Sequence, residues 1–335
     1  MKKSLGWGVL ATGWIAELFT RDLVASGLNV AAVGSRSGKT ADAFARRFGI
    51  PRAHGSYQAL VTDPDVDIIY VATPHPQHAQ AALLALEAGK HVLIEKPFTL
   101  NADEARTVVK RAREKNLVVL EAMWTRFLPH MKRIHEIIDS GVLGELRSVT
   151  AEHRQFLSTD PKHRLNAPEL GGGALLDLGI YPLSFAFDIL GAPTSITATA
   201  RFKDTGVDAE IATIMQHRGG AISTSVSALD CAGPNAAAIY GSKARIVIAP
   251  VWYAPTSFRL EDYQGNVLED YAETVAERGM QFQAFEMERL VRTGTASAIM
   301  PPDESVLIME TLDTIRKQIG LVYPGEDPGK DRQVQ

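Results

Sequence analysis

The chain has 335 residues, of which 45% are hydrophobic and 22% are charged, and its formal net charge is -4. This is an ordinary globular composition with enough residues for two hydrophobic cores, and it lacks the basic excess that a nucleic-acid partner would require. A single cysteine excludes an intramolecular disulfide framework, and neither a standard signal peptide nor a long apolar run is present, so we expect a cytoplasmic protein without a membrane partner.

Residues 1–122 alternate short apolar runs with helical stretches, which is the pattern of βαβ units on a parallel sheet. Glycines directly after three of the helical stretches fit left-handed caps. We therefore predict an N-terminal Rossmann domain, a doubly wound parallel sheet that binds NAD(P). The expected strands are 5–11, 29–34, 67–73, 91–97 and 117–123, and the expected helices are 14–26, 40–48, 77–88 and 102–115.

After this point the pattern becomes strand-rich, with β-branched residues in near alternation and turn signals between the runs. Residues 123–325 are therefore expected to form a C-terminal α/β domain on a large, mostly antiparallel open sheet, with helices at 280–292 and 303–320. The fold class is α/β, and the second domain is predicted to bind the substrate. A broad sheet with one uncovered face indicates a homodimer, and residues 326–335 are expected to form a flexible tail.

The first strand-to-helix turn carries a variant of the dinucleotide-binding fingerprint G-x-G-x-x-G/A, with alanine in the first glycine position. A side chain at Gly13 would block a pyrophosphate from the amides at the start of the helix. Tight strand-helix packing alone would also explain the turn, but its place at the head of a βαβ series favours cofactor binding. The predicted cofactor residues here are Ala11, Thr12, Gly13, Trp14 and Ile15.

The end of the second predicted strand indicates which dinucleotide is bound. An acidic residue there would hold the ribose 2′-hydroxyl of NAD, but none occurs from 29 to 40. Ser35, Arg36 and Ser37 are suited instead to a 2′-phosphate, with Lys39 close behind them. We expect NADP, with NAD as the alternative if this segment is only a solvated basic turn.

Two further strand ends carry polar residues. HVLIEKPF places Glu95 and Lys96 at the carboxyl end of a strand, where open α/β sheets bind ligands. The preceding strand ends in VATPHPQH, and its loop either lines the cofactor or holds histidines with no special task. The two histidines have a spacing that a metal could use, but no nearby cysteine or carboxylate completes a ligand set, so no metal is expected. The loop residues predicted to contact the cofactor are Thr73, Pro74, His75 and His78.

GGGALLDLGIY, residues 171–181, sets three glycines before an apolar stretch that reads as a helix from 174 to 190. Asp177 and Tyr181 are four residues apart and would share one face of that helix. Glycine is used where something comes close to the main chain. The triplet is therefore expected to let the main chain approach the nicotinamide or the substrate.

These motifs together resemble the glucose-fructose oxidoreductase and myo-inositol dehydrogenase family (Gfo/Idh/MocA). The tripeptide Glu95-Lys96-Pro97 carries the resemblance, with the nucleotide loop, VATPHPQH and GGGALLDLGIY. EAMWTRFLP at 121–129, and a tyrosine where many members have histidine, resemble the branch of dimeric dihydrodiol dehydrogenase and NADP-dependent D-xylose dehydrogenase. The resemblance implies hydride transfer between NAD(P) and a sugar or diol, a catalytic Lys96, a cis peptide bond before Pro97 and dimerisation through the open sheet.

The residue types suit that chemistry. Oxidation of an alcohol needs a base for the hydroxyl proton while hydride leaves for the nicotinamide. A free phenol titrates near pH 10, and a nearby ammonium lowers its pKa, so Tyr181 beside Lys96 is a workable acid/base pair. Asp177 can orient a substrate hydroxyl or Lys96. Either Tyr181 or Lys96 could make the direct proton transfer.

Four residues of the second part of the chain are candidates for the substrate pocket: Trp124, Arg126, His153 and Phe156. Trp124 is equally suited to an interdomain core, and Arg126 to a structural ion pair. The favoured function is an NADP-dependent oxidoreductase acting on a sugar such as D-xylose or on a vicinal diol such as a trans-dihydrodiol. The alternatives are a nucleotide-sensing protein without catalysis and an NAD-dependent glycosidase of the same fold.

Overall fold

The computed structural model describes residues 4–326, which contain two separate sheets. The first is a six-stranded parallel sheet in the order β3-β2-β1-β4-β5-β6. Its strands are continuous apolar runs because a parallel sheet is covered on both faces. The strands are β1 (Trp7–Leu10), β2 (Val30–Gly34), β3 (Arg52–His54), β4 (Ile68–Val71), β5 (His91–Glu95) and β6 (Val119–Ala122).

A helix joins each strand of this sheet to the next. Because β1 lies between β2 and β4, the strand order reverses at that point, and the loops after β1 and β4 open on the same crevice at the carboxyl edge. The Rossmann fold predicted from the sequence is confirmed. The helices are α1 (Trp14–Ala25), α2 (Gly38–Phe48), α3 (Tyr57–Val61), α4 (His78–Glu87) and α5 (Ala102–Glu114).

The second sheet has eight strands in the order β14-β13-β12-β11-β7-β10-β9-β8, and all its pairs are antiparallel except β7 with β10. This confirms the mostly antiparallel second sheet. Its strands are β7 (Leu146–Arg154), β8 (Pro193–Phe202), β9 (Asp208–His217), β10 (Ile222–Ala228), β11 (Ala237–Gly241), β12 (Ala244–Ile248), β13 (Phe258–Asp262) and β14 (Val267–Tyr271).

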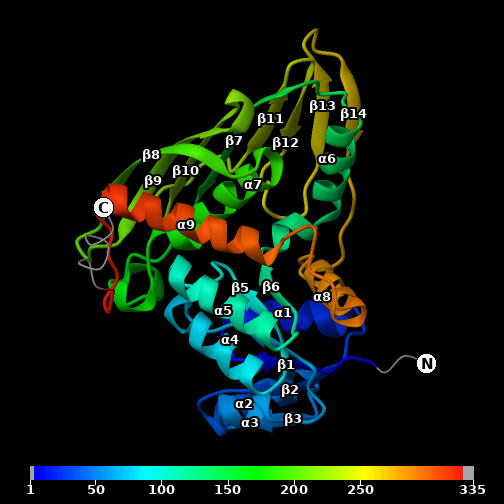
Figure 1. The fold of residues 1–335 in the computed structure, drawn as a ribbon, viewed down its shortest axis with the longest axis vertical. Helices are drawn as coiled ribbons and strands as arrows, with labels where there is room; N and C mark the ends of the chain where they lie inside the picture. The colour runs from blue at the N-terminus through cyan, green and yellow to red at the C-terminus, as the bar shows by residue number, and fades with distance from the viewer. Residues whose placement is uncertain (1–3, 327–335) are drawn as a thin grey trace.

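Four α-helices follow β6 among residues 4–326, and two of them, α7 and α9, lie between the large sheet and the first domain (Figure 1). Helix α7 packs on β7, and α9 contacts β8 on one side and α5 on the other. Figure 1 also shows α8 beside α1, so the second half of the chain reaches the nucleotide-binding edge. The helices are α6 (Pro129–Asp139), α7 (Ile180–Leu190), α8 (Gln281–Thr293) and α9 (Pro302–Ile319).

The segment predicted as one helix from 174 to 190 differs in its first turns. Residues Leu175–Gly179 form a π-helical turn, and the α-helix α7 begins only at Ile180. The buried carboxylate of Asp208 accepts a hydrogen bond from Leu175 N at 2.6 Å and so fixes the start of the segment. Such wide turns occur frequently at functional sites, and this one contains Asp177.

One stretch among residues 4–326, Pro168–Leu190, has the length and hydropathy of a membrane span. Its most apolar window is 89% buried inside the protein. Its π-helical turn and α7 therefore lie in the interior of the second domain.

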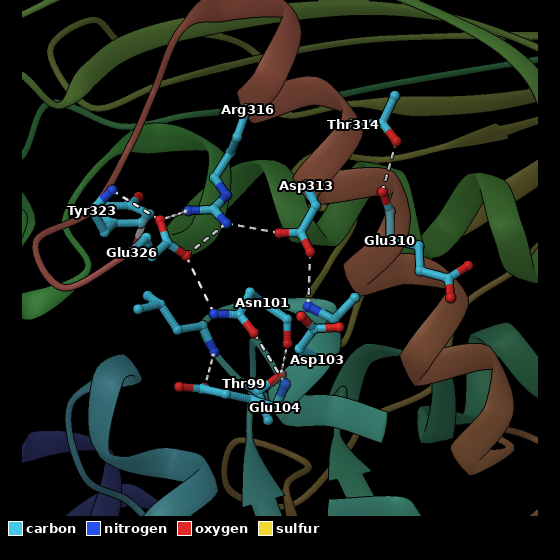
Figure 2. A network of polar contacts seen from close by, with 12 residues as sticks. Thr99, Asn101, Asp103, Glu104, Glu310, Asp313, Thr314, Arg316, Tyr323 and Glu326 are labelled. Atoms are coloured by element: carbon cyan, nitrogen blue, oxygen red, sulfur yellow. Dashed lines mark hydrogen bonds and ion pairs between the residues drawn. The ribbon is translucent and has the colours of Figure 1, made fainter. Parts of the chain in front are cut away.

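A group of polar side chains, which we call the α9 network, ties the last helix to the first domain (Figure 2). Its members are Asn101, Asp313, Arg316, Tyr323 and Glu326. Arg316 donates to Asp313 at 2.8 Å and to Glu326 at 2.8 and 3.0 Å, and Glu326 also accepts from Asn101 at 3.3 Å. Glu326, the first residue of the predicted tail, is therefore held in place, and residues 327–335 lie outside the described residues.

Candidate active site

Three side chains selected from the sequence lie together where the two domains meet. Lys96 follows β5, Asp177 lies in the π-helical turn and Tyr181 is in the first turn of α7. Lys96 Nζ donates to the Asp177 main-chain oxygen at 2.8 Å, lies 3.6 Å from Asp177 Oδ1 and is 5.0 Å from the centre of the Tyr181 ring. The structure thus brings an ammonium, a carboxylate and a phenol from both domains into one buried cluster.

The carboxylate of Asp177 is surrounded by the side chains of Lys96, Arg164 and His75. Arg164 Nη1 lies 3.0 Å and His75 Nε2 3.8 Å from Asp177 Oδ1. Burial acts to raise the pKa of Asp177, but Lys96 and Arg164 outweigh it and hold that pKa well below its usual range. We call Lys96, His75, Arg164, Asp177 and Tyr181 the Lys96 cluster.

The charge of Lys96 is stable in this setting. Burial acts to lower the pKa of Lys96, but Asp177 and the Tyr181 hydroxyl outweigh it, so the net shift is upward. His75 carries no balancing charge because burial lowers its pKa to about 3. With one carboxylate against two cations, the cluster has a net positive charge at neutral pH.

The pKa of Tyr181 is shifted in the direction opposite to the one expected from the sequence. Burial raises the pKa of Tyr181 more than Lys96 lowers it, so the expected net lowering is wrong for this arrangement. The Trp124 Nε1–H group donates to the Tyr181 hydroxyl at 3.0 Å, and this hydrogen bond favours the charged form. Trp124 is buried and adjoins the cluster, so it is both an interdomain core residue and a neighbour of the phenol.

Aromatic rings form the wall next to Tyr181. His153, on β7, stacks on Tyr253 at 3.7 Å between ring centres and meets Tyr181 edge-on at 5.0 Å. Burial lowers the pKa of His153 to about 3, so its ring is neutral. Tyr253 was missed in the sequence, where nothing in the surrounding loop marks it.

The histidine loop after β4 is tied to the Lys96 segment. His78 Nε2 lies 2.8 Å from the Thr73 main-chain oxygen, and His78 Nδ1 lies 2.8 Å from the Pro97 main-chain oxygen. His75 Nδ1 is 3.1 Å from the Gly171 oxygen, and Pro74 precedes it as the first residue of the turn. These contacts join loops, and within residues 4–326 no group of three metal-ligating side chains is found.

Glu95 is buried at the end of β5. Tyr70 donates to Glu95 Oε1 at 2.5 Å, and burial raises the pKa of Glu95 to about 7. The Lys96-Pro97 peptide bond that follows is cis. Glu95 therefore lies at the predicted edge, with one oxygen engaged by the protein itself.

The turn after β1 has the geometry that a pyrophosphate needs. Ala11 occupies the first glycine position of the fingerprint and has φ +87°, a conformation that favours glycine. Thr12 follows it in the turn. Gly13 has open space where a side chain would begin, and α1 has no side-chain cap at its first amides. Trp14 is 64% exposed and Ile15 is partly buried. These residues fit a dinucleotide at the start of α1.

The predicted 2′-phosphate residues lie at the end of β2. Arg36 and Ser37 are exposed, Ser35 is half-buried, and Arg36 lies beside the Tyr57 hydroxyl. No described residue from 29 to 40 is acidic. The segment thus presents a cation and hydroxyls toward solvent at the place where a ribose would end.

Two candidate substrate residues lie away from the cluster. Arg126 Nη1 is 2.5 Å from Glu304 and 3.8 Å from Asp188, and the same side chain donates to Ser184. Arg126 therefore forms the structural ion pair that was the alternative to a role in the substrate pocket. Phe156, beyond the end of β7, is 73% exposed, so no packing holds it against the site.

The glycine triplet serves protein packing rather than ligand approach. A Cβ on Gly171 would meet His75 at 3.1 Å, and one on Gly172 would meet the Leu165 main chain at 2.8 Å. Gly173 has φ +125° and leaves no room beside Asp208. The expectation that the triplet approaches nicotinamide or substrate is therefore wrong, because the three positions are filled by neighbouring loops.

Two arginines near the site were also missed. Arg164 comes from the loop before the triplet, and Arg278 comes from the loop before α8 and lies over the rings of Trp14 and Trp124. Both are loop residues without a periodic pattern, so the sequence offers no signal for them.

Comparison with protein families agrees with the two-domain architecture. Residues 5–123 match an oxidoreductase family described as having an NAD-binding Rossmann fold. Residues 131–247 match the GFO/IDH/MocA C-terminal domain.

Similar proteins include named enzymes. A trans-1,2-dihydrobenzene-1,2-diol dehydrogenase of Mus musculus is 38% identical over 96% of this chain and 98% of its own. A D-xylose 1-dehydrogenase (NADP(+)) of Hypocrea jecorina is 36% identical over 96% of this chain and 93% of its own.

A solved structure of similar fold is a 3-ketoreductase of Actinomadura kijaniata in complex with NADP and TDP-benzene. It superposes with a TM-score of 0.84 at 28% identity, covering 95% of this chain and 98% of that one.

Proposed function

This chain belongs to the Gfo/Idh/MocA oxidoreductase family, and we propose that it transfers hydride between NADP and a hydroxyl-bearing carbon of a sugar or a vicinal diol. The observation that carries the proposal is the meeting of Lys96, Asp177 and Tyr181 at the carboxyl edge of the Rossmann sheet. The substrate class is supported by the diol and D-xylose dehydrogenases to which the chain is similar.

NADP is the favoured cofactor. Arg36 and its neighbouring serines offer a cation and hydroxyl donors for a 2′-phosphate. The named D-xylose relative is NADP-dependent, and the similar ketoreductase was solved with NADP.

The proton is handled by the cluster. The bound nicotinamide would supply the hydride acceptor or donor at its C4. In the direction of reduction the Tyr181 phenol gives its proton to the substrate oxygen while the adjoining carbon receives hydride, and the Trp124 hydrogen bond and the Lys96 charge stabilise the phenolate that remains. In the direction of oxidation the phenol first loses its proton to solvent, and the phenolate then takes the hydroxyl proton of the substrate. Both groups offset the cost of a buried phenolate.

Lys96 and Asp177 act on the electrostatics of this step. Asp177 keeps Lys96 protonated and in place, and Lys96 lowers the energy of the charged phenol. The buried position of all three groups strengthens these interactions by excluding water.

A homodimer through the large sheet is part of the proposal. On five neighbouring strands the register partners Val247, Ala238, Thr150, Thr224 and Ile214 are uncharged, and the row continues to the charged Arg259 on β13. Ile214 is 57% exposed. Ile214→Lys should convert a dimer to a monomer in size-exclusion chromatography with light scattering, and a wild-type monomer would contradict the proposal.

The proposal keeps the small-molecule partner and the cytoplasmic location predicted from the sequence, without nucleic acid or membrane. The central experiment is Lys96→Met with NADP and a panel of aldoses, inositols and cyclic diols. Turnover should fall by at least about 100-fold because the charge beside the phenol is lost, while NADPH binding measured by fluorescence persists.

Lys132→Met, on the exposed face of α6, is the matched control and should keep full turnover. Normal turnover by Lys96→Met would overturn the catalytic assignment. A wild type that binds NADPH but reacts with no substrate would favour a sensing protein, and sugar release without net NADPH would favour a glycosidase.

A further inference from the structure

Arg278 holds a charge that the mechanism above does not use. Its guanidinium carbon lies 5.5 Å from the centre of the Trp14 ring and 5.0 Å from that of Trp124. Trp14 is the first residue of α1 in the nucleotide turn, whereas Trp124 donates to the hydroxyl of Tyr181. Arg278 therefore lies between the start of α1 and the Lys96 cluster.

The loop that carries Arg278 is fixed to the Rossmann domain. Buried Asp22 of α1 accepts from Met280 N at 2.7 Å and from Arg278 N at 3.5 Å. Gly279 has φ +89°, and a Cβ there would meet Leu128 at 2.7 Å. The main chain at Arg278 is thus held against α1 by contacts on both sides.

The guanidinium makes no ion pair among residues 4–326, and the carboxylates of Asp22 and Glu95 interact with its charge only at longer range. No described carboxylate lies within 4.0 Å of its nitrogens, although Glu273 and Glu277 line the same hollow. Its Nε is buried and has no hydrogen-bond partner. A cation with a buried, unused donor gains most from an anion that completes its hydrogen bonds.

The course of a bound dinucleotide supplies such an anion. The dinucleotide must run from the amides at the start of α1 to the Lys96 cluster. Its pyrophosphate is the charged group that lies at those amides. We propose that Arg278 binds the pyrophosphate of the dinucleotide from the side of the second domain, opposite the α1 amides. The proposal rests on the dinucleotide cofactor of the proposed function, and it adds a residue of the second domain to that cofactor's binding site.

The test compares two ligands on one variant. Arg278→Met should weaken NADPH binding, measured by fluorescence titration, by about 10-fold or more, the range for loss of a charged hydrogen bond. Adenosine 2′-monophosphate, which lacks the pyrophosphate, should bind the variant within about twofold of wild type. Arg21→Met is the control: it removes a positive charge from the same hollow, but on α1 two turns after Trp14 and so away from the first amides of the helix, and it should bind both ligands normally.

Arg278→Lys keeps the charge but loses the bidentate fork, and it should give an intermediate loss of NADPH binding. It also serves as the test if Arg278→Met does not fold. Unchanged NADPH binding by Arg278→Met would overturn the proposal. If NADPH binding is unchanged and only the Michaelis constant of the sugar or diol rises, the proposal is likewise overturned. Equal weakening of both ligands would also overturn it. A wild type that binds NADPH without turnover would refute the proposed reaction and leave this inference standing, because its readout is binding.

Discussion

The Lys96 cluster and the α9 network both join the two domains through buried charges, but they balance those charges differently. In the α9 network Arg316 is shared by two carboxylates, Asp313 and Glu326, which also accept main-chain hydrogen bonds. In the Lys96 cluster two cations share one carboxylate, and the phenol of Tyr181 adds no charge.

The difference separates a structural contact from a reactive one. Two carboxylates surround the one guanidinium of Arg316, so the charge of that arginine is balanced without a ligand. The Lys96 cluster has one cation more than it has carboxylates, and this surplus lies beside the buried phenol of Tyr181, where it lowers the energy of a phenolate. Four predictions would break or sharpen this contrast.

The largest effect is expected from two tyrosine hydroxyls compared directly. Tyr181→Phe removes the proton carrier, so kcat should fall by about 100- to 10,000-fold. Tyr323→Phe removes the hydroxyl that donates to the Gly172 oxygen at 2.7 Å, and it should lower the free energy of unfolding by about 1 kcal/mol with kcat near wild type. Steady-state kinetics and urea denaturation measure both, and equal kinetic losses would erase the distinction.

Arg316→Met should give the next largest effect, on stability. It leaves Asp313 and Glu326 without their cation, and loss of one partner of a buried ion pair costs about 3–5 kcal/mol. We expect the lower end, about 3 kcal/mol, because both carboxylates are partly exposed. Arg111→Met, whose ion pairs with Glu87 and Glu114 are on the surface, is the control and should unfold like wild type. A change in kcat at equal folded fraction would show that the network also acts on catalysis.

Glu95, which adjoins the Lys96 cluster, and Glu326 of the α9 network should differ in the sign of their pH dependence. Burial raises the pKa of Glu95 from 4.5 to about 7, so its stabilising contribution is full below pH 4.5 and is lost as the pH rises to 7. Burial acts to raise the pKa of Glu326, but Arg316 outweighs burial and the net pKa is lowered. The stabilising contribution of Glu326 is therefore present above pH 4.5 and is lost as the pH falls below that value.

The measurement is the unfolding free energy of wild type minus that of Glu95→Gln or Glu326→Gln, as a function of pH. Subtraction removes the opposing contributions of His75 and His153, whose pKa values are lowered to about 3. The Glu95 difference should fall with rising pH and the Glu326 difference should fall with falling pH. If both differences changed with pH in the same direction, the assignment of a raised pKa to Glu95 and a lowered pKa to Glu326 would be wrong.

The smallest effect is expected from Arg164→Met. The side chain is 46% exposed, so its bond to Asp177 should contribute less than about 1 kcal/mol to unfolding. Lys96 still pairs with Asp177 in this variant, and kcat should stay within a few-fold of wild type. A loss as large as that of Lys96→Met would show that Arg164 belongs to the catalytic machinery.

Much of the fold could be predicted because its signals are local. The alternation of apolar runs and helices marks the Rossmann sheet, and the turn at Gly13 marks its first crossover. Lys96 and Tyr181 could be selected because each stands in a motif. The other features depend on long-range contacts: Tyr253, Arg164 and Arg278 lie on loops whose positions only the assembled domains determine.

The incorrect expectations have the same origin. The glycines at 171–173 are conspicuous in the sequence, but the atoms that crowd them come from the 164–165 turn, the His75 loop and β9. The pKa of Tyr181 was expected to fall because an ammonium is nearby, yet the opposing effect of burial requires the packed interior to be known. Arg126 was a substrate candidate, but its guanidinium is engaged by Glu304 of α9, a contact that only the assembled domains determine.

The contact between Asn101 and Glu326 spans 225 residues of sequence. Ribosomal synthesis proceeds from the amino terminus, and early domains generally fold first. The Rossmann sheet can form before Glu326 has been made, but the segment just after Lys96 and Pro97 gains this anchor only once residue 326 has been synthesised and the second domain has packed against the first. Completion of the reactive edge therefore depends on the folding of both domains.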